Sequence, residues 1–311
     1  MVAPRRPPRS PLQRRIALLR HRASRLPVTV KGMLWVSFAG FQFVLLNTLV
    51  RSLTLHLHPF QAQFLRYVFS VVVMAPLVIH AGLAAYRPRR ISGQFARGAM
   101  HTVGLMLWFT ALPRIPMADT TAIGFTSPIF IMLGAYLVFH EAMRWERWLA
   151  AAIGFGGVVI VVAPKLSAGA GLPSLLMVAS SVVFAASFLM TKALTRYERV
   201  EVIVLWQAIA VSLFSLPLAW WFWTTPTGWQ WTGFLVSGVM GVTAHYCITR
   251  GFAVADISST QSVKFLELVW ASALGWIVFS ESPSSSTLIG GAVICGSTIW
   301  IAHRESRQRI R

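Results

Sequence analysis

Acidic residues are scarce in this sequence. Its 311 residues include nine Asp and Glu against 28 Lys and Arg, so the formal net charge is +19 at pH 7. Charged residues of both signs make up 12% of the chain, whereas 56% of it is hydrophobic, and the mean hydropathy is +0.63. Soluble domains carry about 25% charged residues, so this composition is typical of a chain that folds in lipid.

The shortage of polar surface also limits the classes of function. A nucleic-acid-binding protein carries its basic residues on a polar surface, and this sequence has almost none. The two cysteines, Cys247 and Cys295, lie in apolar stretches, which excludes a disulfide framework and a cysteine metal site. An enzyme needs converging ionisable residues, and the nearest approach to such a set, His140 with Glu141, lacks further partners. We therefore expect no nucleic-acid partner, cofactor, metal or catalytic residue.

Long hydrophobic runs, by contrast, are abundant. A bilayer core about 30 Å thick requires about 20 apolar residues in helical conformation. Ten segments near this length follow one another, separated by short connections rich in helix-breaking proline. The expected spans are 32–51, 60–80, 97–113, 119–139, 147–164, 172–192, 200–223, 230–249, 257–279 and 287–302. The sequence thus predicts an all-α integral membrane protein with ten transmembrane helices.

Lys and Arg gather on one side of these spans. Twenty-three of the 28 lie in the N-terminal arm, in the loops on the same side and in the C-terminal tail. The other side carries Arg51, Arg114 and Lys165, while Arg66 and Lys264 lie within spans. Because positively charged loops stay in the cytoplasm, both termini are predicted to be cytoplasmic.

The two ends of the chain are basic. Residues 1–31 carry nine Lys and Arg and no acidic residue, and residues 303–311 form a basic cytoplasmic tail. An Arg-rich, Ser-containing start can be a mitochondrial targeting peptide. It can also be a cytoplasmic arm attracted to anionic lipid, which we favour, since each basic residue near the membrane surface gains about 1 kcal/mol.

The two halves of the chain resemble each other at a constant shift of 140 positions, here called the repeat offset. Residues 118–141 align with residues 258–281, and Glu141 then meets Glu281. Because each copy holds five spans, an odd number, the second copy must enter the membrane in the opposite sense. We therefore predict two inverted five-helix repeats, as in carriers that alternate between two open states.

The chain resembles the EamA-like group of the drug/metabolite transporter superfamily in the stretches FTALPRIPMADTTAI, SPIF…FHE and FLEL…FSE and in Arg66 of FLRYVFS. The resemblance implies two EamA repeats of five helices, here residues 32–165 and 171–302. The family usually places Glu-Pro in the ninth helix, where this chain has Glu267 followed by Leu268. A kink is therefore expected at Pro128 in the fourth helix, while a kink in the ninth stays open.

The same resemblance implies the function. A secondary transporter would carry a small polar or zwitterionic metabolite, amino-acid-like or S-adenosylmethionine-like, by alternating access. The stretches KFLEL and ESPSSSTLIGGAVI are similar to the branch of S-adenosylmethionine uptake carriers. An exporter of drugs or other metabolites is the alternative, and a membrane-embedded enzyme or scaffold is a more distant one. We expect the bacterial inner membrane as the location, with a small-molecule substrate and the lipid bilayer as partners.

Ionisable residues inside spans are the first candidates for the binding site, because a charge at the bilayer centre costs at least about 2.5–3.5 kcal/mol unless it faces protein, water or a partner. Lys264 and Glu267 lie three residues apart, on one face of the ninth span. They either bind substrate or form a structural ion pair with each other. Arg66 either binds a substrate carboxylate, extends to the membrane surface or satisfies a carbonyl of a broken helix.

Aromatic and small polar residues complete the predicted site. Trp108 and His101 on the third span, with His245 and Tyr246 on the eighth, bring rings toward one cavity, where they could attract a cation. For Trp108 the favoured alternative is packing or a place in the interfacial aromatic belt. His101, near the cytoplasmic end of its span, is expected to contact headgroups or water instead. Asn47, Gln42, Thr126, Ser127, Ser180 and Ser187 either line the cavity or bond neighbouring helices. The predicted substrate-binding residues are Lys264, Glu267, Arg66, Tyr246, Trp108, Asn47, Ser127 and Thr126.

Two further features are expected to be structural. Glu141 and Glu281 end their spans and should fix loops through helix-end contacts. The fifth and tenth spans are rich in glycine, which permits close packing of helices. These two spans also offer a contact for a homodimer.

Overall fold

The computed structural model describes residues 26–124, 126–140, 145–167, 171–260, 263–264 and 266–308. These residues form helices and short connections and contain no strand. The first half holds α2 (Val28–Thr54), α3 (Pro59–Ala81), η1 (Leu83–Tyr86), α4 (Ile91–Ala111), η2 (Leu112–Arg114), α5 (Met117–Gly124), α6 (Thr126–Phe139) and α7 (Trp145–Ser167). The second half holds α8 (Gly171–Leu194), α9 (Val200–Trp221), α10 (Gly228–Val254), α11 (Ile257–Thr260), α12 (Leu266–Phe279) and α13 (Ser285–Gln308).

Five helical stretches of the described chain are long and apolar enough to cross a membrane. They are α2, α3, residues 119–139, α8 and α9, and shorter apolar helices accompany them. Helix α4 falls outside this set because Gln94, Arg97 and His101 lie on its buried face and lower its hydropathy. The arrangement is that of an all-helical membrane protein.

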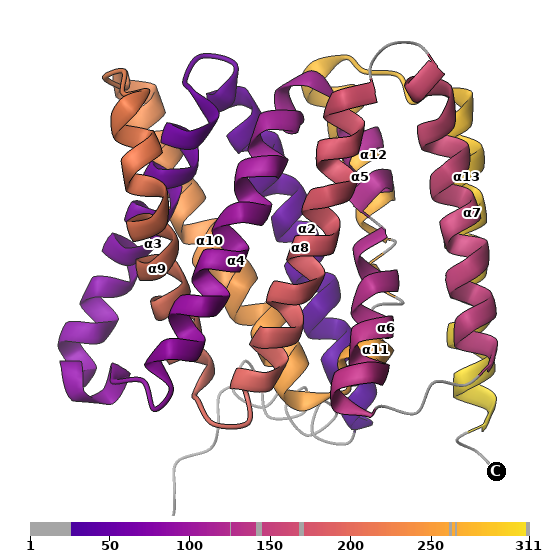
Figure 1. Cartoon of the computed structure of the whole chain (residues 1–311), viewed down its shortest axis with the longest axis horizontal. Coiled ribbons are helices and arrows are strands. Elements are labelled where there is room, and N and C mark those ends of the chain that lie inside the picture. The colour runs from indigo at the N-terminus through magenta and orange to yellow at the C-terminus, as the bar shows by residue number, and fades with distance from the viewer. Residues whose placement is uncertain are drawn as a thin grey trace, which may run out of the picture.

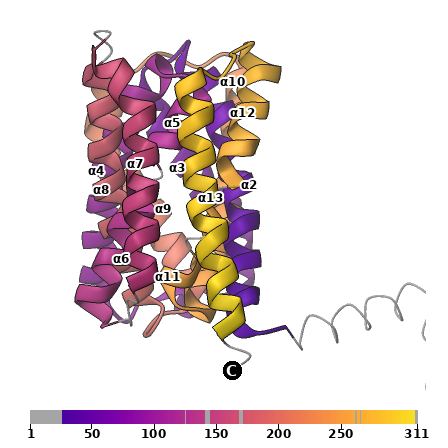
Figure 2. The ribbon, with the colours of Figure 1, turned by 90° about the vertical axis from the view of Figure 1, so that its right-hand side faces the viewer.

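The repeat offset seen in the sequence relates the helices as well. It carries residues 126–139 of α6 onto residues 266–279, which are the bounds of α12. It also carries residues 59–81 of α3 onto 199–221, close to the bounds of α9. The packing repeats in the same way, since α2 packs on α10 as α8 packs on α4. Helices α3 and α9 pack on each other, as do α7 and α13 at one edge of the bundle (Figures 1 and 2).

Helices α2 and α8, which the repeat offset relates, begin at opposite ends of the bundle. In Figure 1, α2 begins at the lower end of the bundle, where α13 also ends, whereas α8 begins at the upper end.

Residues 1–25 and Glu141 lie outside the described residues, so the basic arm and one of the two helix-end glutamates stay predictions. Helix α13 continues to Gln308, through most of the predicted tail.

The ninth expected span is interrupted although it lacks proline. Val263 and Lys264 form a 3₁₀ turn between α11 and α12. Lys264 lies in this turn, and Glu267, the other ionisable residue of the span, is the second residue of α12. In the fourth expected span, Pro128 lies in α6, and residues 119–139 form one helical stretch apart from residue 125, which is outside the described residues. The kink expected at Pro128 stays a prediction.

Two close helix contacts depend on glycine. A Cβ at Gly98 of α4 would overlap Cβ of Ala210 on α9. A Cβ at Gly251 of α10 would lie 3.1 Å from the carbonyl oxygen of Gly32 on α2. Small residues thus bring α4 to α9 and α10 to α2, as is common between membrane helices. The expected homodimer contact through α7 and α13 stays a prediction.

Candidate functional site

A cavity lies where helices of the two halves meet. It encloses about 870 Å³ free of protein atoms, a figure that includes the part open to solvent. Side chains from α2, α3, α4, α5, α6, α8, α10 and α12 and from the interrupted stretch before α12 form its wall. The lining residues are Phe43, Val44, Asn47, Arg66, Tyr67, His101, Leu105, Trp108, Phe109, Thr121, Gly124, Ser127, Ser181, Phe184, Phe188, His245, Lys264 and Glu267.

Most of the residues predicted to bind substrate belong to this wall. Asn47, Arg66, Trp108, Ser127, Lys264 and Glu267 line the cavity. Thr126 and Tyr246 do not. The Thr126 hydroxyl donates to the carbonyl of Ile123 at 2.9 Å. The Tyr246 ring packs edge-on against Trp35, with 6.2 Å between the ring centres. Binding of substrate by any of the eight residues stays a prediction.

Lys264 and Glu267 are both on the wall, and within the described chain no hydrogen bond or ion pair joins them. The Lys264 ammonium instead lies 5.3 Å from the centre of the Phe188 ring, within the range of a cation–π contact. Glu267 lies in the first turn of α12, where the helix dipole favours a negative charge. Its Oε1 is buried and has no hydrogen-bond partner among the described residues. The described residues thus show no direct ion-pair contact between these two side chains, and substrate binding by them stays a prediction.

Arg66 is buried at the cavity and does not extend to the membrane surface. The residue is 4% exposed, and its guanidinium carbon lies 4.6 Å from the centre of the Tyr67 ring. Nε of Arg66 has no partner in the described part of the chain. Gly241 of α10 lies beside the guanidinium, and a Cβ there would lie 3.4 Å from Nη2. Arg66 is thus available to an anionic group in the cavity.

A buried polar network forms one side of the cavity. The Tyr67 hydroxyl lies 3.1 Å from Nε2 of His101 and 3.3 Å from Nε2 of His245. His101 also contacts the hydroxyl of Ser187 through Nδ1 at 3.0 Å. Gln207 reaches His245 from another side, with 3.5 Å between Nε2 atoms. The expectation that His101 contacts headgroups or water is wrong, because this network holds the ring in the interior.

Arg97 anchors the network from outside the cavity. Its guanidinium donates to the Thr191 hydroxyl, to the carbonyl of Ile203 at 3.2 Å and to Oε1 of Gln207. The residue is 1% exposed, so a charge that the sequence assigns to the membrane surface is buried between α4, α8 and α9. Sequence reasoning identifies neither Arg97 nor Tyr67 nor Gln207 as a site residue. The adjacency of Tyr67 to Arg66 is the local signal that could indicate the tyrosine.

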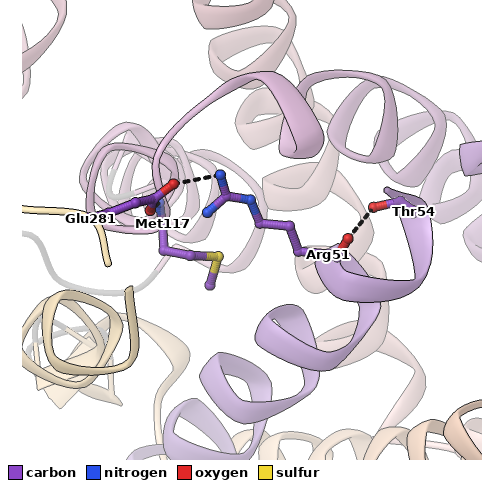
Figure 3. A network of polar contacts seen from close by, with 4 residues as sticks. All are labelled: Arg51, Thr54, Met117 and Glu281. Carbon is purple, nitrogen blue, oxygen red and sulfur yellow. Dashed lines mark hydrogen bonds and ion pairs between the residues drawn. The ribbon is translucent and has the colours of Figure 1, made fainter. Parts of the chain in front are cut away.

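A second buried cluster lies near the ends of α2 and α12. Arg51 donates from Nη2 to Oε1 of Glu281 at 2.6 Å, and Oε2 of Glu281 accepts the backbone N–H of Met117 at 2.9 Å (Figure 3). The guanidinium carbon of Arg51 also lies 4.4 Å from the centre of the Phe279 ring. Glu281 therefore makes the helix-end contact expected of it, and it ties the end of α12 to α2 and to the start of α5.

The chemistry of the wall is mixed. Two cationic side chains, one carboxyl group and two imidazoles face a space that is otherwise bounded by six aromatic side chains and seven small polar, aliphatic or glycine residues. In the described part of the chain, no group of three or more His, Cys, Asp or Glu residues is placed to hold a metal ion. Such a wall can bind a small molecule that has both charged and ring-shaped parts, through ion pairs, hydrogen bonds and stacking.

Comparison with known proteins gives a consistent result. The model of the EamA-like transporter family matches residues 30–163 and 172–302. A riboflavin transporter of Rhizobium johnstonii is 34% identical over 283 residues, which are 90% of this chain and 93% of that protein. An S-adenosylmethionine uptake transporter of Rickettsia prowazekii is 25% identical, with 91% and 96% covered. A pseudopaline exporter of Pseudomonas aeruginosa is 26% identical, with 86% and 95% covered.

The fold has a counterpart among solved structures. One crystal structure aligns with 86% of this chain, and 98% of its own chain is covered, with a TM-score of 0.66 at 20% sequence identity. At this level of identity the likeness concerns the fold alone.

Proposed function

The chain belongs to the EamA-like transporter family, and we propose that it is a secondary transporter of a small polar or zwitterionic metabolite. It is an integral membrane protein, in agreement with its apolar helices. The family and the names of its relatives indicate transport rather than enzymatic catalysis.

The observation that carries the proposal is the set of charged groups on the cavity wall. Arg66, Lys264 and Glu267 all line the cavity, and within the described chain neither cation forms an ion pair with the carboxyl group. Leaving charges without such partners in a membrane protein is costly, so these residues commonly mark a substrate or ion path. A zwitterionic substrate would supply a carboxylate for a cation and an ammonium or sulfonium for Glu267.

Alternating access of two inverted repeats would move the substrate. Support comes from the constant offset between helix bounds of the two halves and from the opposite directions of α2 and α8 (Figure 1). Each repeat would cross the membrane five times, which gives ten spans. Carriers of this kind bind substrate near the midplane, between the repeats and beside an interrupted helix. The interruption at Val263 and Lys264 offers such a feature in the second repeat.

The substrate class draws on the relatives as well. Proteins named as transporters of riboflavin and of S-adenosylmethionine are similar along nearly the whole chain. Both molecules join a flat heterocyclic ring to a polar part, and the cavity offers aromatic rings beside charged groups. Export is the second candidate, because one similar protein is named as an exporter. The bacterial sources of the relatives favour the inner membrane, and the charge of the loops favours cytoplasmic termini.

Uptake of a panel of labelled metabolites into proteoliposomes tests the proposal directly. The panel includes riboflavin, S-adenosylmethionine and zwitterionic amino acids. We expect at least one of them to accumulate or exchange, and a folded protein that moves none of them would contradict the proposed substrate class.

Variants of the two charged residues test the site. The double variant Lys264→Met/Glu267→Gln should fold and should lose substrate affinity, because both charged ends of the ligand lose their partners. The matched control is Arg199→Met/Glu201→Gln, which removes an exposed ion pair with N and O atoms 3.5 Å apart. Wild-type affinity in a stable Lys264/Glu267 double variant would show that these residues serve packing rather than binding.

A further inference from the structure

A chain of hydrogen bonds leads from outside the cavity to one of its lining residues. Arg97 and Gln207 do not line the cavity, whereas His245 does. Arg97 donates from Nη2 to Oε1 of Gln207, and Nε2 of Gln207 lies 3.5 Å from Nε2 of His245. All three residues are at most 5% exposed, so water does not compete freely for these groups.

The chemistry of arginine fixes the direction of every bond in this chain. A guanidinium can only donate, so the atom of Gln207 that faces Arg97 must be its carbonyl oxygen. The amide NH₂ then points at His245 and can only donate in turn. Nε2 of His245 must therefore carry a lone pair, and the ring proton of neutral His245 lies on Nδ1.

The rest of the network agrees with this assignment. Nε2 of His245 has one lone pair, which the Gln207 amide at 3.5 Å and the Tyr67 hydroxyl at 3.3 Å then share. With its proton on that side, the Tyr67 oxygen accepts from Nε2–H of His101 across 3.1 Å. Nδ1 of His101 is then the acceptor for the Ser187 hydroxyl at 3.0 Å. Each of these hydrogens finds an acceptor, and the two histidines have opposite tautomers.

One group is left over, namely Nδ1–H of His245. Nδ1 is buried and has no hydrogen-bond partner among the described residues. A buried donor without an acceptor is costly, and the ring belongs to the cavity wall. We infer that Nδ1–H of His245 donates to an acceptor oxygen or ring nitrogen of the transported molecule, and that Arg97 and Gln207 are positioning residues that hold it in this tautomer.

The donor belongs to one repeat only. At the repeat offset His245 corresponds to Leu105, which also lines the cavity and whose side chain has no polar atom. A single donor on one side of an otherwise repeated scaffold would fix the orientation of an asymmetric substrate. This role rests on the proposed transport function, but the tautomer can be measured without any transport.

Nitrogen NMR of ¹⁵N-histidine-labelled protein in nanodiscs reads the tautomer, because protonated and unprotonated ring nitrogens differ widely in chemical shift. The His245→Gln variant assigns the signal of His245. We expect Nδ1–H for His245 and Nε2–H for His101 in the wild type. In Gln207→Glu, a carboxylate faces both Arg97 and His245 and accepts from Nε2, so His245 should change to Nε2–H. Loss of one donor to the substrate should then lower affinity about tenfold.

Affinity is measured in the same nanodiscs with riboflavin, with S-adenosylmethionine and with any metabolite that the uptake panel identifies. Gln42→Glu is the matched control, since Gln42 accepts a hydrogen bond from Thr243 outside the network and should change neither reading. An Nε2–H tautomer in the wild type, or a reversed tautomer with unchanged affinity, would overturn the inference. Failure of the wild type to transport any metabolite would refute the proposed function and would leave the tautomer assignment standing.

Discussion

Replacing Glu281 by Gln should destabilise the protein by about 3 kcal/mol, the lower end of the ~3–5 kcal/mol that follows from removing one partner of a buried ion pair. The reason is the position of Arg51. Its side chain is 9% exposed, and Nε and Nη1 have no partner among the described residues, so the bond from Nη2 to Glu281 at 2.6 Å is the contact that compensates its charge. Glu281 itself keeps 23% side-chain exposure, so water screens part of the loss.

The double variant separates the ion pair from other effects of the substitution. The glutamine side chain of Glu281→Gln retains an oxygen that can accept the Met117 N–H, so the contact with α5 need not be lost. In Arg51→Met/Glu281→Gln the buried charge is also removed, and most of the stability should return. The free energy of unfolding in mild detergent, measured for both single variants and the double variant, gives the coupling energy of the pair.

The exposed pair Arg199 and Glu201 serves as the control. Its side chains are 65% and 34% exposed. Breaking this pair should therefore cost less than about 1 kcal/mol. A Glu281→Gln variant as stable as Glu201→Gln would refute the reasoning, because Arg51 would then have to find water or another partner when residue 281 is neutral.

Two further predictions concern topology and packing. Cysteines placed at Pro88 and Gln308, in a chain without Cys247 and Cys295, should react with an impermeant label only from the cytoplasmic side, since the loop charge predicts this orientation. Labelling of either position in intact cells would contradict the ten-span arrangement. Gly98→Ala should destabilise the protein by about 1–3 kcal/mol, because the new Cβ would overlap that of Ala210. Gly156→Ala, where a Cβ meets nothing within 4 Å, should leave the thermal midpoint unchanged.

The helices could be predicted from the sequence because lipid imposes a simple rule. Every backbone group in the bilayer must be paired within the protein, so apolar runs of sufficient length become helices. The interruption at Val263 and Lys264 is not predictable in this way. Proline marks a kink through its own chemistry, whereas a break without proline depends on the neighbours that surround the chain there.

Arg97 and His101 show why the polar part of the site could not be placed from the sequence. Hydropathy assigns a charge near the end of a span to the membrane surface, since it ignores partners that are distant in the chain. The acceptors of Arg97 are Thr191, the carbonyl of Ile203 and Gln207, and these lie on α8 and α9. Only their arrangement in space compensates the guanidinium for its loss of water.

Lys264 and Glu267, on the other hand, could be placed in the cavity because a charge in the middle of an apolar span has few other locations. At the repeat offset their counterparts are Gly124 and Ser127, which line the cavity too. The backbone positions therefore repeat while the charges do not. In the proposed transport cycle the two halves exchange conformations, and this requires halves with similar backbones. A site that binds one asymmetric molecule needs unlike halves, so the residues that differ between the copies are the ones expected to determine the substrate.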